Sequence, residues 1–256
     1  MRVAIITGAA QGIGRRTAEI FAAAGYSLAL MDIRSCDSTL AAVRAQGVDA
    51  EEFIGDISDE VTVTRTVEAV QSRWGRADVL VNNAGISFIS PAEAVEAQAF
   101  RRVLEVNLIA PFLLAKGFGV MMLEQRVGSI VNVASIAGLV GISDRTAYNA
   151  SKHGLIGLTR TLAAEWGGRG VRCNAVCPGW VKTEMDVADQ EGGGYSDEDI
   201  IGRNPMGRFA APEDIARAIL FLADPEQSGF INGQALPVDG GWTTDGSWQS
   251  LRMRHR

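Results

Sequence analysis

The chain has 256 residues, 47% of them hydrophobic, with 29 glycines and only 7 prolines. This composition excludes a disordered or fibrous protein and allows one large α/β core. A formal net charge of −6 argues against a general nucleic-acid surface. We find no apolar run near the roughly eighteen residues that cross a bilayer and no signal peptide in the opening MRVAIITGAA, so we expect a cytoplasmic protein with no membrane partner.

The cysteines are an odd set of three, Cys36, Cys173 and Cys177, and the chain has only two histidines that could join them as ligands. We interpret them as buried thiols that behave as small hydrophobes, and we expect no metal site. The basic tail LRMRHR, residues 251–256, is predicted to be a solvated terminus.

The first predicted strand, residues 3–7, runs into the glycine-rich turn TGAAQGIG, and a helix is expected from 12 to 24. Such a turn lets a helix N-terminus approach a pyrophosphate closely, and the helix dipole favours that negative charge. The second strand, 27–32, ends in Asp32, 18 residues after Gly14, near the spacing expected of a ribose-binding carboxylate. The sequence therefore predicts a dinucleotide site.

Asp32 also predicts which dinucleotide is bound. A carboxylate about 5 Å from a doubly charged 2′-phosphate would be repelled by roughly 1.7 kcal/mol even at the dielectric of water. NAD should therefore be preferred over NADP. Arg15 and Arg34 are the two side chains that could reach such a phosphate and weaken the preference, whereas Gln11 and Ile33 carry no charge.

Short apolar runs continue along the chain and alternate with segments of helical period. A helix is expected over 58–74, with Ser58 as its N-cap, and a long apolar helix from about 100 to 122. Continuously apolar runs are typical of buried parallel strands. The predicted fold is a doubly wound α/β sheet with helices on both faces, in a single domain over residues 1–256. The further strand candidates are residues 78–83, 129–135, 171–178 and 235–239.

The stretch YNASK places Tyr148 and Lys152 four residues apart, just before an apolar helical run. On a helix this spacing puts the two side chains on one face, within reach of each other or of one bound molecule. A later segment, 180–210, is polar and acidic and carries three consecutive glycines. A loop of this length inside a compact domain is usually a lid or a disordered segment, and we expect a substrate lid.

These motifs together resemble the short-chain dehydrogenases/reductases, in their short single-domain branch. TGAAQGIG is similar to the glycine turn of that branch, GDIS at 55–58 to its adenine-contacting acid, and NNAG at 82–85 to its post-strand motif. PGWVKT at 178–183 resembles the nicotinamide-side segment, and VDGG at 238–241 the end of its last strand. The resemblance implies a Rossmann-type sheet of seven strands. It also implies assembly as homotetramers or homodimers, through the helices that carry Asn107 and Tyr148 and through the C-terminal strand.

The resemblance also implies the site residues. The catalytic set would be Asn107, Ser135, Tyr148 and Lys152. The cofactor would be held by Tyr148 and Lys152 together with Gly8, Gln11, Gly12, Ile13, Gly14, Asp32, Asp56, Ile57, Asn83, Ala84, Gly85, Pro178, Gly179, Val181 and Thr183.

Alcohol oxidation explains why a lysine should accompany the tyrosine. A base must remove the hydroxyl proton, and free tyrosine, with a pKa of about 10, is a poor base near neutral pH. A lysine ammonium about 5 Å away, at an effective dielectric near 20, favours the phenolate by roughly 3.3 kcal/mol. Ser135, at the end of a strand, would orient the substrate oxygen, and Asn107 would hold a water that links Lys152 to solvent.

The substrate remains open at this point. The acidic lid and the expected NAD preference favour oxidation of a neutral polyol, sugar or similar secondary alcohol to its ketone. Reduction of a 3-oxoacyl thioester is the alternative within the family. A nucleotide sensor without chemistry and a sugar-nucleotide epimerase are alternatives from other classes, disfavoured by the complete catalytic set and by the lack of room for a longer substrate domain. Asp144 and Arg145 are interpreted as a solvated pair, or as contacts to a polar substrate.

Overall fold

The computed structural model describes residues 1–191, 195–247 and 251. The lid predicted over 180–210 is therefore described apart from 192–194, and the tail predicted to be solvated lies outside the described residues except for Leu251.

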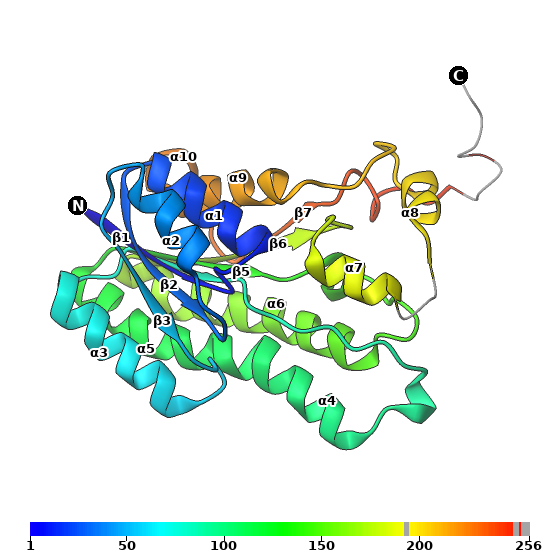
Figure 1. Cartoon of the computed structure of the whole chain (residues 1–256), viewed down its shortest axis with the longest axis horizontal. Helices are drawn as coiled ribbons and strands as arrows, with labels where there is room; N and C mark the ends of the chain where they lie inside the picture. The colour runs from blue at the N-terminus through cyan, green and yellow to red at the C-terminus, as the bar shows by residue number, and fades with distance from the viewer. Residues whose placement is uncertain (192–194, 248–250, 252–256) are drawn as a thin grey trace.

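Seven parallel strands form one sheet in the order β3-β2-β1-β4-β5-β6-β7 (Figure 1). This confirms the predicted doubly wound sheet. The chain crosses from one half of the sheet to the other between β1 and β4, and in open α/β sheets such a switch point is where ligands bind. The strands are β1 (Arg2–Thr7), β2 (Tyr26–Asp32), β3 (Ala50–Ile54), β4 (Val79–Asn82), β5 (Gly128–Val133), β6 (Val171–Pro178) and β7 (Ala235–Val238).

Helices cover both faces of the sheet, with α1, α2 and α9 on one side and α3, α5 and α6 on the other (Figure 1). The principal helices are α1 (Gly12–Ala23), α2 (Asp37–Arg44), α3 (Glu60–Trp74), α4 (Ala97–Leu104), α5 (Ala110–Gln125), α6 (Thr146–Trp166), α7 (Glu184–Glu191), α8 (Asp197–Arg203), α9 (Pro212–Ala223) and α10 (Pro225–Ser228). Short helical turns complete the set: η1 (Ala92–Ala94), η2 (Glu105–Ile109), η3 (Ile136–Gly138) and η4 (Gly167–Arg169).

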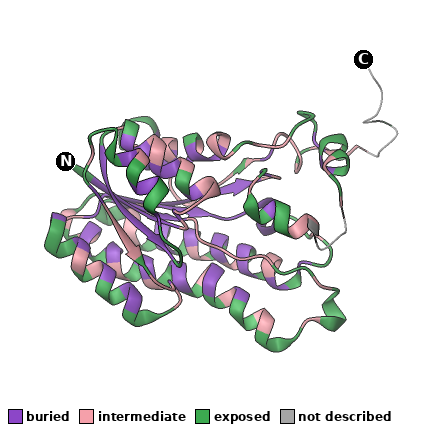
Figure 2. Ribbon diagram, in the orientation of Figure 1, coloured by how far each residue is buried: buried purple, intermediate pink, exposed green. Residues whose placement is uncertain are grey.

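The strands are the most buried part of the molecule, as Figure 2 shows. Side chains that alternate along β1 feed two separate cores, so that Ile6 packs with Phe21 of α1 while Ile5 packs with Phe118 of α5. Burial on both faces explains why these runs are continuously apolar. The three cysteines are all buried and free, as predicted.

The structure corrects three details of the sequence analysis. The helix expected from Ser58 begins at Glu60, because the Asp59 side chain, and not Ser58, accepts hydrogen bonds from the backbone N–H groups of Val61 and Thr62. The edge strand β3, which contains Glu51 and Glu52, is not predicted by the sequence analysis. The long apolar helix is interrupted by the π-helical turn η2.

The expectation that no segment is apolar enough to cross a membrane is also corrected. The continuous helical stretch Ala97–Gln125 contains a window with a mean hydropathy of 1.7, long and apolar enough by length and composition alone, and it is the single such helix in the described part of the chain. Of that window, 56% is buried inside the molecule. Phe118 and Leu114 lie in the core beneath the sheet, so the apolar character serves internal packing.

Candidate active site

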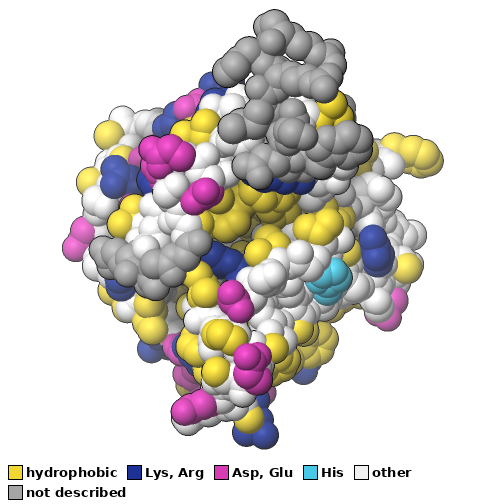
Figure 3. All heavy atoms as spheres, turned by 90° about the vertical axis from the view of Figure 1, so that its right-hand side faces the viewer, with side chains coloured by type: hydrophobic (Ala, Val, Ile, Leu, Met, Phe, Trp, Pro, Cys, Tyr) yellow, Lys and Arg dark blue, Asp and Glu magenta, His cyan; other side chains and the backbone are white. Residues whose placement is uncertain are grey.

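A cleft of about 420 Å³ lies at the carboxyl ends of the strands. Figure 3 views the molecule from this end and shows hydrophobic side chains gathered near the middle of the face. Every residue that the sequence analysis assigned to catalysis or cofactor binding lines this cleft except Gly14 and Asn107, which lie directly behind its wall. The structure thus brings the predicted residues together.

The turn after β1 leaves room for a ligand close to the backbone. A Cβ on Gly14 would lie 1.9 Å from the carbonyl oxygen of Gly8, and Gly8 itself has a φ of +68°. The Asn83 amide donates to the carbonyls of Thr7 and Gly8 and fastens the turn to the end of β4. In the described structure no side chain caps the N-terminus of α1 at Gln11, and its first turn has no acidic residue. The turn therefore fits the pyrophosphate of a dinucleotide, which would bind the free N–H groups.

Asp32 is held at the rim of the same cleft. Its two carboxylate oxygens accept hydrogen bonds from the backbone N–H groups of Ala10 and Arg34, both at 3.0 Å. The Arg34 guanidinium lies on the cleft wall with its Nε 3.7 Å from the Asp32 carboxylate. An acceptor fixed at this edge can bind the hydroxyls of a ribose.

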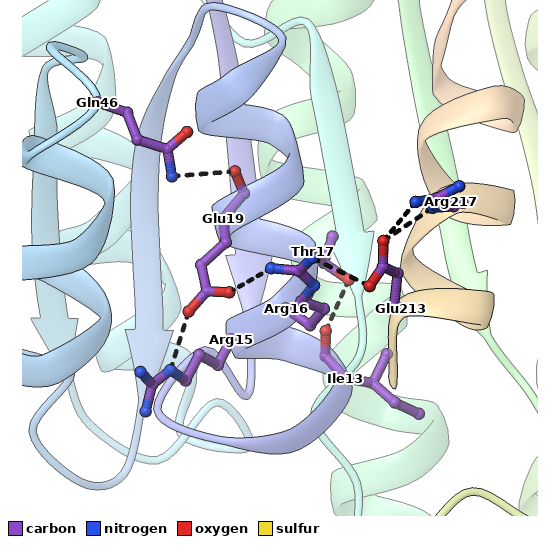
Figure 4. A network of polar contacts seen from close by, with 8 residues as sticks. All are labelled: Ile13, Arg15, Arg16, Thr17, Glu19, Gln46, Glu213 and Arg217. Carbon is purple, nitrogen blue, oxygen red and sulfur yellow. Dashed lines mark hydrogen bonds and ion pairs between the residues drawn. The ribbon is translucent and has the colours of Figure 1, made fainter. Parts of the chain in front are cut away.

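Arg15, the other cation considered for a phosphate, is engaged elsewhere (Figure 4). Its Nε lies 3.1 Å from a carboxylate oxygen of Glu19, which also binds Arg16 at 2.8 Å. Arg16 in turn reaches Glu213 of α9 at 3.1 Å. This network fastens α1 to α9 and leaves Arg34 as the cation beside Asp32.

Asp56 and Ile57 follow β3 and line the cleft beyond Asp32. The Asp56 carboxylate accepts from the Ser58 backbone and hydroxyl and from Arg102 at 2.7 Å. Burial alone would raise the pKa of this carboxyl, but the hydrogen bonds from Ser58 and Arg102 outweigh it and lower the pKa. Arg102 was not predicted as a site residue, and it joins α4 to this wall.

Asn107 lies in the π-helical turn η2, with its side chain buried. Its amide oxygen accepts from the backbone N–H of Ile86, and its nitrogen donates to the Ile86 carbonyl, both at 2.9 Å. The same nitrogen donates to the hydroxyl of Ser151, which donates to the Tyr148 carbonyl. Asn107 therefore connects the post-β4 loop to the helix that carries Tyr148.

Ser135 and Tyr148 meet at the centre of the cleft. Ser135 is the N-cap of η3, and its hydroxyl accepts from the Ala137 N–H at 3.1 Å. Burial raises the pKa of Tyr148, against the opposing effects of a hydrogen bond with Ser135 and of the positive charge of Arg145. The two hydroxyls can together hold one substrate oxygen.

Lys152 lies one helical turn after Tyr148 and is only 3% exposed. Its Nζ donates to the Val133 carbonyl at 2.8 Å and lies 5.5 Å from the centre of the Tyr148 ring. Burial lowers the pKa of the ammonium to about 8. The predicted proximity is confirmed, but burial dominates the pKa of Tyr148 and raises it, whereas we expected Lys152 to lower it.

The segment after β6 closes the far side of the cleft. Gly179 donates its N–H to the Val238 carbonyl at 3.0 Å, and Pro178 pairs with Val238 of β7. Val181 forms a bridge with Ala210, so the two ends of the 180–210 segment lie side by side. The described part of that segment is largely helical, in α7 and α8, instead of the irregular loop that we expected.

Arg145 and the residues around it are the part of the site that the sequence did not reveal. Arg145 is 7% exposed, in contrast to a solvated pair, and its Nη1 donates to Ser87 and to Asp189 of α7, both at 2.8 Å. Trp180 stacks edge-on against Tyr195, with ring centres 4.8 Å apart. Arg145, Asp189, Trp180 and Tyr195 line the cleft. The position of Arg145, three residues before Tyr148, is the one signal that the sequence offers.

The comparisons with known proteins agree with this geometry. A family model described as Enoyl-(Acyl carrier protein) reductase matches residues 8–243. The D-threitol dehydrogenase of Mycolicibacterium smegmatis is 40% identical over 245 residues, covering 94% of this chain and 93% of that protein.

Two solved structures are similar throughout. The crystal structure of levodione reductase has a TM-score of 0.91 at 36% identity and covers 95% of this chain and 98% of that one. A protein from Beutenbergia cavernae, assigned as an NAD(P)-dependent gluconate 5-dehydrogenase and solved with NADP at low occupancy, has a TM-score of 0.88 at 39% identity, covering 95% and 97%. The chain therefore belongs to the short-chain dehydrogenase/reductase family, as an oxidoreductase that acts on CH–OH groups with a nicotinamide cofactor.

Proposed function

We propose that the protein oxidises a secondary alcohol of a neutral polyol or sugar to the ketone, with NAD as the preferred cofactor and Tyr148 as the acid/base. The observation that carries the proposal is the placement of the Ser135 and Tyr148 hydroxyls together in the cleft, with buried Lys152 one helical turn behind them. The bound cofactor would supply the acceptor for hydride from the alcohol carbon.

Ser135 and Tyr148 would hold the reacting oxygen and move its proton. Ser135 donates to the substrate oxygen and fixes it beside the phenol, and Tyr148 takes the proton during oxidation or returns it during reduction. Because burial raises the pKa of Tyr148, the phenol is protonated in the structure described, which suits it to donate to a ketone. Oxidation needs the phenolate, and positive charge near the ring favours that form.

Lys152 would provide that charge and release the proton. An ammonium with a pKa of about 8 is close to neutrality and can exchange its proton near physiological pH. Asn107 would position the groups behind it, because a Cβ on Gly85 would lie 3.2 Å from the Asn107 amide oxygen and 3.6 Å from Lys152 Nζ. The two side chains therefore both face the backbone of Gly85 in the cleft wall.

The preference for NAD rests on Asp32. Its carboxylate is fixed by two backbone N–H groups at the cleft edge and would repel a 2′-phosphate. Arg34, half-exposed beside it, is the group that would soften this preference. The gluconate 5-dehydrogenase relative was solved with NADP, so the ratio of the two cofactors is a property to be measured.

The choice of a polyol is supported by the threitol dehydrogenase and by the polar end of the cleft at Arg145 and Asp189. The runner-up is a 3-oxoacyl-thioester reductase. The description of the matching family model shares its acyl-carrier substrate, although an enoyl reductase reduces a carbon–carbon double bond and not a ketone. A sensor that binds the cofactor without turnover is the third candidate, and the combination of Ser135, Tyr148 and Lys152 argues against it.

We also propose assembly into homodimers or homotetramers through the helices that carry Asn107 and Tyr148. Ile109, Phe112 and Val120 expose large apolar side chains along η2 and α5. Exposed apolar surface of this kind is typical of an interface between subunits. Light scattering at micromolar concentration would measure the mass.

The substitution Tyr148→Phe tests the mechanism. We expect turnover to fall about 10²- to 10⁴-fold, because the phenol is the acid/base, while NADH still binds. Tyr26→Phe is the matched control, since Tyr26 is buried between β2 and α1 and does not line the cleft. Nicotinamide absorbance with a panel of polyols, sugars, cyclic alcohols and hydroxyacyl thioesters gives the rates, and full activity in Tyr148→Phe would refute the mechanism.

A further inference from the structure

The substrate end of the cleft holds a buried charge pair whose position needs an explanation. Arg145 stands at the N-cap of α6, where the helix dipole disfavours a cation, yet it is one of the least exposed charged residues. Its Nη1 binds Asp189 of α7 and Ser87 of the loop after β4, and its guanidinium carbon lies 5.4 Å from the centre of the Trp180 ring. Three segments far apart in sequence thus meet around one side chain.

The hydrogen-bonding capacity of Arg145 is only partly used. Both of its side-chain hydrogen bonds to described residues leave from Nη1, so the donors on Nε and Nη2 have no partner within the described chain. Neither nitrogen is fully enclosed by protein, so acceptors for these donors can come from the cleft. Because Arg145 lines the cleft, a ligand in the cleft can supply them.

The carboxylates around this position at least balance its cations. Asp189 is mostly buried and neutralises Arg145, and Asp186 of the same helix shares Lys182 with Asp197, at 3.2 and 2.6 Å. The subsite therefore offers guanidinium donors and carboxylate acceptors with no excess positive charge. A hydroxyl group both donates and accepts, so it suits such a pair, whereas a carboxylate bound at Arg145 would lie against Asp189.

The pair is also close to the reacting group. Arg145 precedes Tyr148 by three residues, and the charges of Arg145 and Asp189 both influence the pKa of the Tyr148 phenol, in opposite directions. A group bound at the pair would therefore lie on the same substrate molecule as the reacting carbon.

We propose that Arg145 and Asp189 form a hydroxyl-binding subsite that selects neutral polyhydroxylated substrates and rejects the corresponding acids. This inference deepens the proposed function and rests on it. Asp189 would make the subsite prefer neutral over anionic substrates. Arg145 would bind a substrate hydroxyl other than the one that is oxidised.

The test compares three substrates: a four-carbon polyol, its aldonic acid and 2-butanol. For the wild type we expect kcat/KM to be highest for the polyol. Asp189→Asn keeps the shape of the side chain but exposes the charge of Arg145, so the ratio of kcat/KM for the polyol to that for the acid should fall at least about tenfold. Arg145→Gln should lower kcat/KM for the polyol about 10- to 100-fold, mainly through KM. It should lower kcat/KM for 2-butanol at least about fivefold less, because only the loss of the Arg145 charge near Tyr148 affects both substrates.

Asp197→Asn is the matched control. Asp197 begins α8, pairs with Lys182 at 2.6 Å, and does not line the cleft, so its loss should leave the substrate ratios unchanged. Thermal melts with NADH would establish that each variant is folded. Calorimetry can also measure binding of the polyol to the Tyr148→Phe protein saturated with NADH, where no turnover occurs. Adding Arg145→Gln to this protein should weaken binding of the polyol at least about tenfold.

The outcomes separate the two proposals. If the wild type oxidises no alcohol of the panel, the proposed function fails and this inference fails with it. If alcohols are oxidised but Asp189→Asn changes the ratio no more than Asp197→Asn, or Arg145→Gln weakens 2-butanol and the polyol equally, the inference alone is overturned.

Discussion

The two ends of the cleft are built by different means. At the nucleotide end the surface that would meet the pyrophosphate is backbone, with the turn at Gly8 to Gly14 folded so closely that one added Cβ would meet a carbonyl. At the substrate end the wall consists of side chains, with Arg145 fixed by partners 58 and 44 residues away along the chain. Backbone groups can bind a ligand that all members of a family share. A ligand that varies between members is bound by side chains, which can be substituted without changing the fold of the sheet.

The largest effect that distinguishes the two ends is expected from glycine substitutions. Gly14→Ala would place its Cβ 1.9 Å from the Gly8 carbonyl oxygen, a clash that only a shift of the backbone could relieve. We expect the free energy of unfolding to fall by about 1 to 3 kcal/mol or more, and the affinity for NADH to fall at least about 100-fold. Gly202→Ala, in α8 at the substrate end, meets nothing within 4 Å and should be neutral or stabilising by up to about 1 kcal/mol. Thermal melts measure the stability of both variants, and NADH titration measures their cofactor affinity. Equal effects of Gly14→Ala and Gly202→Ala would contradict the proposed difference between the two ends of the cleft.

Asp32 tests whether the nucleotide end also discriminates by charge. Asp32→Asn removes the repulsion of roughly 1.7 kcal/mol and should shift the ratio of kcat/KM for NAD to that for NADP at least about tenfold towards NADP. Asp56→Asn is the control, because Asp56 lies beyond Asp32 and should weaken both cofactors alike. If Asp32→Asn leaves the ratio unchanged, Asp32 is not the determinant.

The smallest effect concerns stability at the junction of the two ends. Burial lowers the pKa of Lys152 to about 8 from 10.5, so below pH 8 the folded protein carries a buried charge at a cost of about 3 kcal/mol. Lys152→Met removes that cost but leaves the Val133 carbonyl without its donor, which costs about 1 to 3 kcal/mol. We expect an inactive protein that at pH 7 is more stable by about 1 kcal/mol, raising Tm by about 2 to 4 °C.

The sign of the pH dependence provides the check. Between pH 8 and 10.5 the unfolded chain binds more protons at Lys152 than the folded chain, so wild-type stability gains with pH relative to the variant. The advantage of Lys152→Met should therefore shrink or reverse as the pH rises through this window. Exposed Lys116→Met serves as the control, and a stability difference for Lys152→Met that does not vary with pH would contradict the explanation.

The sequence predicts almost all residues of the nucleotide end, because a glycine turn between a strand and a helix is a local pattern. It missed β3 because Glu51 and Glu52 interrupt the apolar run in an edge strand that is only partly buried. It placed the cap of α3 one residue early, as Ser58 and Asp59 are both good caps and only geometry separates them. The role of Arg145 was left open because its partners Ser87 and Asp189 are neighbours only after folding.

The π-helical turn η2 has a further consequence for how this gene can vary. A π turn accommodates one residue more than an α turn, and one residue corresponds to about 100° of rotation around a helix. Deleting a single codon within 105–109 would let the helix continue as a regular α-helix, with α4 and α5 both preserved, but it would turn Asn107 away from Ile86. Deleting one residue at this point should therefore preserve the fold and abolish activity. Substitutions in the 180–210 segment should instead change the substrate preference.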